Sequence, residues 1–337
     1  MRPTIYDVAK EAGVSIATVS KIINHKGGIS ERTKNNVLRV MKELNYHPNI
    51  MATALTGKNT NSIGLVLPDL ANPFFSELAR KIEDRGHELG YSIMICSTDY
   101  KKEKELKYIQ LLKSKSVDAI ILASGFEDEE VISRLLKEKL PVSIVAKNFP
   151  SISINTVAID DFQGGYIATT HLLELGHTKI AIIARDVYSN RERMRGYYQA
   201  LMDYGVDYKF EFRFATESNV ETGTRMAREI LDSETGATAF VACNDLLAIG
   251  AIQAGREKGF NIPNDLSVVG FDNTIIAEVY DPPLTTVSQP IGDMGKEIMD
   301  LTVAEIAGEK GKRKVILVPD LIVRRSTRIR VDEMIDE

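Results

Sequence analysis

A run of small and basic side chains at residues 15 to 21 has the chemistry of a surface that contacts a nucleic acid. The run reads Ser15, Ile16, Ala17, Thr18, Val19, Ser20 and Lys21. Its hydroxyl groups can exchange hydrogen bonds with phosphate oxygens, and no acidic side chain interrupts it. Two helical patterns that meet at one turn must position these residues.

The turn lies between predicted helices at residues 4–12 and 16–23. Apolar residues at Ile5, Val8, Ala9 and Ala12 follow the helical period. Gly13 can end the first helix in a left-handed conformation, and Ser15 can cap the second. Two short helices joined by a glycine turn indicate a helix-turn-helix that binds DNA. The alternative is a helical hairpin that only packs.

A third helix is predicted at residues 31–44, with Val37, Leu38, Met41 and Leu44 on its buried side. Pro48 ends it, and a short helix at residues 50–55 follows. An isolated helix of this length is unstable in water, because even about 12–15 residues are marginal. We expect this segment to fold only against DNA or a partner chain; a plain linker is the alternative.

Charge is distributed unevenly along the 337 residues, whose net charge is −5. Residues 1–58 hold nine lysines and arginines against four acids, a net charge of +5, which leaves −10 for the remainder. A basic head on an acidic body suits a small DNA-binding unit attached to a domain with another task.

Without a signal peptide or an apolar run of about 20 residues, a cytoplasmic location is expected. Cys96 and Cys243 lie in apolar runs and are expected to be buried free thiols.

From residue 62 the pattern alternates between short apolar runs and helices, which predicts parallel sheets covered by helices. It runs to residue 147 and restarts near Thr156, and residues 212–216 are read as a further strand. The extended stretch 314–327, interrupted at Pro319, could add a strand to each half.

The predicted fold is an all-α helix-turn-helix head plus an α/β body of two doubly wound parallel-sheet subdomains. The expected domains are 1–48, a hinge at 49–60, and a body at 61–330, divided into 61–158 with 290–318 and 159–287 with 319–330.

Polar side chains gather where the predicted strands end, which is where ligands bind in open parallel sheets. Carboxylates, amides and a guanidinium beside aromatic rings can bond the hydroxyls of a sugar. Single members could instead cap helices or form turns at strand ends, and this alternative applies to Asp245, Asn273 and Asp160. The candidates are Asp69, Phe74, Phe75, Ser124, Asp160, Asp161, Arg193, Asn244, Asp245, Asp272, Asn273 and Gln289.

Catalytic and metal-binding patterns are missing from the sequence. The five histidines lack metal-ligand spacing, and there is neither a G-x-S-x-G elbow nor a phosphate-binding loop. Gly164 and Gly165 are expected to allow close helix packing rather than to bind a dinucleotide. We therefore expect no cofactor, no metal and no enzymatic activity.

The ordered motifs resemble those of the lactose/galactose-repressor (LacI/GalR) family of bacterial transcription regulators. They are YDVAKEAGVSIATVSKIIN, LNYHPN with ATAL, PDLANPFF, HLLELGH, RMRGYYQAL, ACNDLLAIGA, VVGFDN and PPLTTVSQP. The resemblance covers nearly the whole chain. It implies a homodimer that binds a pseudo-palindromic operator, and a body with the periplasmic sugar-binding-protein type I fold.

The resemblance also assigns DNA contacts. It places Ile16, Ala17 and Lys21 at base edges and lets Ser15, Thr18 and Ser20 bond phosphate. Tyr6 and Asn24 complete the contacts of the head. In the hinge it implies that Ala52 approaches the minor groove and that Leu55 wedges into the central base step. Thr53 stands where many relatives have arginine.

For the body, the resemblance places the effector at Arg193, Asn244, Asp272 and Gln289, together with Phe75, Asp160 and Ser124. The expected function is a ligand-controlled transcription regulator, most simply a repressor of sugar-use genes. The alternatives are control by a protein partner or a phosphorylated metabolite, a sugar-binding transport protein, and a sugar-active enzyme. The basic head opposes the transport protein.

Overall fold

The computed structural model describes residues 3–23, 27–46, 60–123, 129–138, 140–149, 151–207, 214–233 and 235–330. The chain separates into two compact units, Met1–Thr60 and Asn61–Glu337, and each has its own apolar core. The predicted hinge helix at residues 50–55 lies outside the described residues, and so do Asn24, Ala52, Leu55 and Ser124.

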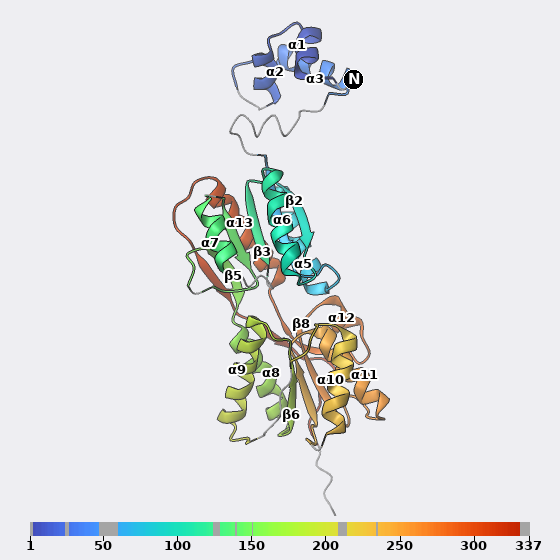
Figure 1. Ribbon diagram of the computed structural model, residues 1–337. Helices are drawn as coiled ribbons and strands as arrows, with labels where there is room; N and C mark the ends of the chain where they lie inside the picture. Colours follow the sequence, from blue (N-terminus) through green and yellow to red (C-terminus); the bar gives the residue numbers. More distant parts are fainter. Residues whose placement is uncertain are drawn as a thin grey trace, which may run out of the picture. The chain divides into compact units, whose positions relative to one another are not determined.

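The first unit contains the predicted helix-turn-helix. Its helices are α1 (Ile5–Ala12), α2 (Ile16–Ile23) and α3 (Glu31–Glu43) (Figure 1). Gly13 ends α1 with a left-handed φ of 66°, and the Val14 N–H donates to the Ala9 carbonyl oxygen at 3.0 Å. This turn folds α2 back, so that Val8 and Val19 meet α3 in one apolar cluster.

The buried side of α3 differs from the prediction at one residue. Leu38 is 45% exposed, whereas Val40 is buried. Val37, Val40, Met41 and Leu44 follow the i, i+3, i+4, i+7 spacing of a helix face, and Leu38 lies one position off that face. The prediction for Leu38 was wrong because it followed the apolar character of the residue instead of its place in the helical period.

The second unit consists of two lobes, and the first lobe is built on a parallel sheet of six strands in the order β10-β5-β4-β3-β1-β2. Helices α5 and α13 pack on one face with Ile63 and Leu65, and helices α6 and α7 pack on the other with Val66 and Ile120. The strands are β1 (Ser62–Leu67), β2 (Ser92–Ser97), β3 (Ala119–Ala123), β4 (Val142–Val145), β5 (Asn155–Ile159) and β10 (Lys314–Leu317). The helices are α5 (Pro73–Glu88), α6 (Lys102–Ser114), α7 (Glu129–Lys137) and α13 (Ile291–Ile306).

The second lobe repeats this arrangement on five strands in the order β11-β9-β8-β7-β6, with β11 antiparallel at the edge. Its strands are β6 (Ile180–Ile183), β7 (Ala239–Ala242), β8 (Ser267–Asp272), β9 (Thr285–Ser288) and β11 (Asp320–Ile322). Its helices are α8 (Asp161–Glu174), α9 (Tyr188–Asp203), α10 (Val220–Asp232), α11 (Asp245–Glu257) and α12 (Ile275–Val279). β9 and α12 were not predicted. Of the strand predicted at 212–216, the described part makes an isolated bridge from Ala215 to Arg185.

The chain passes between the lobes through the segments 159–161, 288–291 and 317–320, which join β5 to α8, β9 to α13 and β10 to β11. The last of these contains Pro319, and the stretch around it adds one strand to each sheet, as predicted. A movement of one lobe against the other must be absorbed in these short segments.

Two glycines allow α8 and α9 to pack with their backbones in contact. A Cβ atom at Gly165 would collide with the carbonyl oxygen of Arg193, and a Cβ atom at Gly196 would collide with that of Phe162. Gly164 faces the ring of Phe271, where a Cβ atom would lie at 2.7 Å. The prediction that the glycine pair allows close helix packing is confirmed. This close packing holds the backbone of Arg193 against α8.

Replacing Gly165 with alanine should destabilise the second unit by at least about 2 kcal/mol, because the methyl group has no space beside a backbone oxygen. Gly292→Ala is the matched control, since Gly292 also lies in a helix but nothing lies within 4 Å of its Cβ position. We expect that control to leave stability unchanged or to raise it by about 0.5 kcal/mol. Urea unfolding followed by circular dichroism measures both, and equal effects would contradict the packing argument.

Candidate ligand-binding site and nucleic-acid interface

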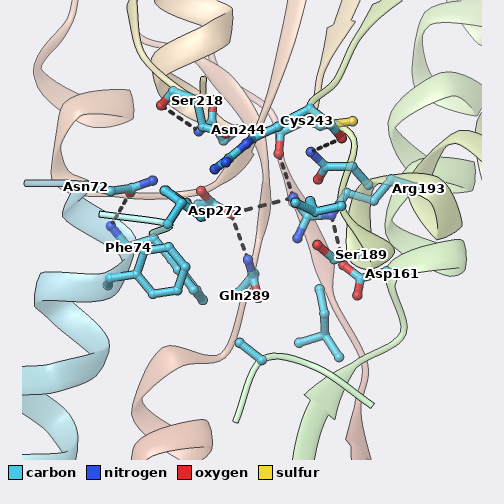
Figure 2. Close-up of a pocket in the computed structure, with 17 residues that line it drawn as sticks. Asn72, Phe74, Asp161, Ser189, Arg193, Ser218, Cys243, Asn244, Asp272 and Gln289 are labelled. Atoms are coloured by element: carbon cyan, nitrogen blue, oxygen red, sulfur yellow. Dashed lines mark hydrogen bonds and ion pairs between the residues drawn. The ribbon is translucent and has the colours of Figure 1, made fainter. Parts of the chain in front are cut away.

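A polar cavity in the second unit is lined by residues of both lobes, at the carboxyl ends of their strands (Figure 2). The first lobe contributes an apolar side, where the Phe74 and Phe75 rings meet edge to face with centroids 5.0 Å apart. The second lobe contributes most of the polar groups. The residues around the cavity are Asn72, Phe74, Phe75, Tyr100, Ala146, Ile159, Asp161, Arg185, Val187, Ser189, Asn190, Arg193, Ser218, Cys243, Asn244, Asp272 and Gln289.

Arg193 is the centre of the polar side and is only 7% exposed. Its Nε donates to Asp161 Oδ1 at 2.8 Å, and its Nη1 donates to the carbonyl oxygen of Cys243 at 2.6 Å (Figure 2). The guanidinium carbon lies 3.4 Å from the centroid of the Phe271 ring. A planar cation held on three sides in this way presents its remaining edge in a fixed direction.

Asp272 lies beside this guanidinium. Its Oδ1 accepts a hydrogen bond from Gln289 Nε2 at 2.7 Å and lies 3.9 Å from Arg193 Nη1. Gln289 belongs to the second crossing segment, and Asp161 belongs to the first. Two of the polar side chains that line the cavity are therefore attached to segments on which the lobes would hinge.

Buried polar bonds hold the backbone that carries Asp272. Asp272 and Asn273 have positive φ values of 106° and 54°. Asp245 Oδ2 accepts from the N–H and the hydroxyl of Thr274, both at 2.8 Å. Arg324 Nη2 donates to Asn273 Oδ1 at 2.7 Å. These bonds compensate for an uncommon backbone conformation and direct Asp272 into the cavity.

Burial changes the acidity of these carboxyl groups. It raises the pKa of Asp272 from 3.8 to about 8, although Arg193 and the hydrogen bond from Gln289 act in the opposite direction. It raises the pKa of Asp161 to about 6 against the opposing charge of Arg193. A protonated Asp272 can donate as well as accept a hydrogen bond, which suits recognition of a hydroxyl group.

Seven of the candidate residues line the cavity: Phe74, Phe75, Asp161, Arg193, Asn244, Asp272 and Gln289. Asn244 also caps α11, because its Oδ1 accepts from the Leu247 N–H at 2.8 Å. Asp69 and Asp160 are not among the lining residues. Asp69 accepts from the Ala71 N–H at 2.8 Å, and Asp160 caps α8 by accepting from the Gln163 N–H at 2.9 Å. Asp161, the neighbour of Asp160, reaches the cavity instead.

Sequence reasoning did not single out as site residues Asn72, Tyr100, Val187, Ser189 and Asn190, which also line the cavity. Arg185, which the sequence suggested only as a contact for a phosphorylated ligand, lines it too. Tyr100 follows β2, so the rule on strand ends could have identified it. The rule was applied to other strands, because their ends carry acids or amides.

The exposed side of α2 forms the candidate nucleic-acid interface of the first unit. Ala17 and Lys21 are exposed, Ile16 is 40% exposed, and Tyr6 on α1 is 68% exposed. The Ser15 hydroxyl accepts from the Thr18 N–H at 3.1 Å and lies 2.9 Å from the Thr18 hydroxyl. The exposed side chains of Ile16 and Ala17 can contact thymine methyl groups, and that of Lys21 can reach base edges or phosphate.

Neither a metal cluster nor a membrane span occurs in the described parts of the chain. No group of three histidine, cysteine or acidic side chains there is arranged to hold a metal ion. None of the helices in those parts is both long and apolar enough to cross a bilayer.

The raised pKa of Asp272 predicts a pH dependence of stability. The folded protein retains this proton up to about pH 8, whereas the unfolded chain releases it near 3.8, so the free energy of unfolding should fall as the pH rises between these values. Asp272→Asn keeps the shape and removes the titration, so its urea unfolding should depend less on pH across this window. Asp207 is exposed and serves as the control. The free energy of unfolding of Asp207→Asn should depend on pH as that of the wild type does. If the free energy of unfolding of Asp272→Asn fell with pH as steeply as that of the wild type, the raised pKa of Asp272 would be contradicted.

The comparisons with known proteins match a family in each of the two units. Residues 4–49 match the family "Bacterial regulatory proteins, lacI family", and residues 169–327 match "Periplasmic binding protein-like domain". The transcriptional regulator DegA of Bacillus subtilis is 47% identical over 333 residues, which is 97% of this chain and 98% of that protein.

Solved structures extend the similarity to the whole fold. A lac repressor dimer bound to operator and the anti-inducer ONPF is 28% identical, covers 97% of this chain and 100% of its own, and gives a TM-score of 0.87. The regulator CelR in complex with cellobiose is 30% identical. The match covers 96% of this chain and 100% of the CelR chain, and it gives a TM-score of 0.73. The chain belongs to the LacI family of bacterial regulatory proteins, and it is a DNA-binding transcription regulator.

Proposed function

We propose that this regulator is a repressor that binds a pseudo-palindromic operator as a homodimer and that a small effector in the cavity controls its affinity for DNA. One observation carries the proposal: a single chain joins an exposed helix-turn-helix surface to a polar cavity lined by two lobes. The effector is a sugar or a sugar-like compound, since the cavity offers amides, carboxyl groups and a guanidinium beside two phenylalanine rings.

On DNA, α2 enters the major groove with Ile16, Ala17 and Lys21 at the base edges. Isoleucine and alanine offer apolar contact to thymine methyl groups, and Lys21 reaches guanine or phosphate. Ser15, Thr18 and Ser20 bond phosphate and set the register. The structure of a lac repressor dimer on its operator supports this placement. Residues 49–60 connect the two units, and we assign the hinge contacts to Ala52 and Leu55.

Control by the effector follows from the two-lobed cavity. A ligand that contacts Phe74 in the first lobe and Arg193 in the second binds best at one relative placement of the lobes. It can shift the DNA-binding equilibrium only by its difference in affinity for the two placements, which is typically about 1–3 kcal/mol. The complex of the relative CelR with cellobiose supports a sugar in this cavity.

The cavity binds its ligand without transforming it. Arg193 holds Asp161 and Gln289 holds Asp272, an arrangement that suits the binding of hydroxyl groups. A regulator of this kind works where the chromosome of a bacterium lies, in the cytoplasm.

Lys21→Ala should change which operator sequences are preferred, because a lysine at a base edge discriminates between bases. Selection from random duplexes, followed by fluorescence anisotropy on the selected sites, measures the change. The control is Lys42→Ala on the exposed side of α3, which removes the same charge. Equal weakening on every sequence would reduce Lys21 to a phosphate contact, and failure of the wild type to select any sequence would refute the proposed function.

A further inference from the structure

Arg185 is a cavity residue with an unfilled hydrogen-bonding position. It follows β6 and lines the cavity from the second lobe. Its Nη1 is shielded from solvent and has no hydrogen-bond partner in the part of the chain that the structure describes. A buried donor without an acceptor is rare in folded proteins and marks a position where a ligand, an ion or water completes the bonding.

The charge of Arg185 is also left without a counterion among the described residues. Its guanidinium carbon lies 3.6 Å from the centroid of the Tyr100 ring. Burial raises the pKa of Tyr100 to about 12, so this phenol stays neutral near pH 7 and supplies no negative charge. The adjacent acid, Asp186, is exposed and pairs with Arg191 at 2.7 Å.

The other acids of the cavity are already engaged. Asp161 is bound by Arg193 Nε at 2.8 Å, and Asp272 accepts from Gln289. Burial raises the pKa of Asp272 to about 8, which leaves it largely protonated near pH 7. The cavity therefore contains two guanidinium groups and one compensating carboxylate, and the uncompensated guanidinium is that of Arg185.

The start of α9 adds a second preference for negative charge at the same place. Val187 occupies the N-cap position and gives no side-chain hydrogen bond, and no acidic residue lies in the first turn. Val187, Ser189 and Asn190 line the cavity, and Asn190 donates its side-chain amide to the Arg185 carbonyl oxygen at 3.2 Å. The free N–H groups at the start of a helix favour an anion.

We infer that the effector of this regulator carries an anionic group, a carboxylate or a phosphate, which binds between the Arg185 guanidinium and the first turn of α9. This inference rests on the proposed function, in which the cavity is the effector site. The remaining hydroxyl groups of the effector face Asn244, Asp272 and Gln289. The ligand class is thus a sugar acid or a sugar phosphate, rather than a neutral sugar.

Inorganic phosphate tests the anion site without knowledge of the effector. Sodium phosphate should raise the melting temperature of the full-length chain above that in sodium chloride of equal ionic strength, and Arg185→Gln should lose most of this increment. General salt effects act equally on all variants. Arg191→Gln, which removes the neighbouring exposed arginine, should keep the increment. Equal increments in the wild type and Arg185→Gln, or no increment in the wild type, would overturn the inference.

Isothermal titration calorimetry with matched sugars distinguishes the two anions. Glucose, glucuronate and glucose 6-phosphate form one set, and the corresponding galactose compounds form another. An anionic member should bind more tightly than its neutral parent, and Arg185→Gln should weaken it by about 10- to 100-fold. Preference for the uronate identifies a carboxylate, and preference for the ester identifies a phosphate.

Three further outcomes separate this inference from the proposed function. Neutral sugars that bind as tightly as the anionic ones, to wild type and Arg185→Gln alike, would overturn the inference and leave the proposed function intact. Failure of wild type to bind any selected operator would instead refute the proposed function. If none of the six sugars binds, the phosphate titration still decides the matter. Arg185→Lys, which keeps the charge, should retain part of the phosphate effect.

Discussion

The ion pair between Arg193 and Asp161 is the interaction on which the site depends, and it has little access to water. Removing a guanidinium and a carboxylate from water is costly, and their attraction offsets this cost only with close geometry and further hydrogen bonds. Here the 2.8 Å contact, the bond to the Cys243 carbonyl oxygen and the Phe271 ring provide that geometry. Apolar side chains would pack in this place at less cost, so the charges indicate a site kept for recognition.

The glycine contacts of α8 and α9 explain how so demanding a pair is positioned. Gly165 brings the two backbones together at Arg193, and Asp161, the last residue of the first crossing segment, begins α8. Gln289, on the second crossing segment, reaches Asp272 from the other side. A ligand that alters any bond of this network acts on the segments that join the lobes, which gives a physical route from the cavity to the rest of the chain.

Much of the fold could be predicted from the sequence because periodicity reports burial on one face. The helices of the head and the buried strands of both sheets carry long or fully apolar signals. β9 and α12 do not: Thr285–Ser288 is short and polar, and its threonines are buried because they bond Asp245 and Thr327. At the cavity, a shift of one residue decides that Asp161 rather than Asp160 points inwards. The position of Arg185 over Tyr100 joins two lobes, and no local pattern contains that information.

Replacing the buried pair as a whole tests its central role most directly, because Asp161→Asn with Arg193→Met leaves no unpaired charge behind. The partly exposed pair of Glu192 and Arg195 on the same helix, 2.7 Å apart, provides the matched double variant Glu192→Gln with Arg195→Met. Operator affinity is measured by fluorescence anisotropy with and without each sugar of a panel that affects the wild type. We predict that the buried double variant binds the operator within about threefold of wild type but no longer responds to any sugar, while the partly exposed double variant responds normally. A full response in the buried double variant would contradict the account.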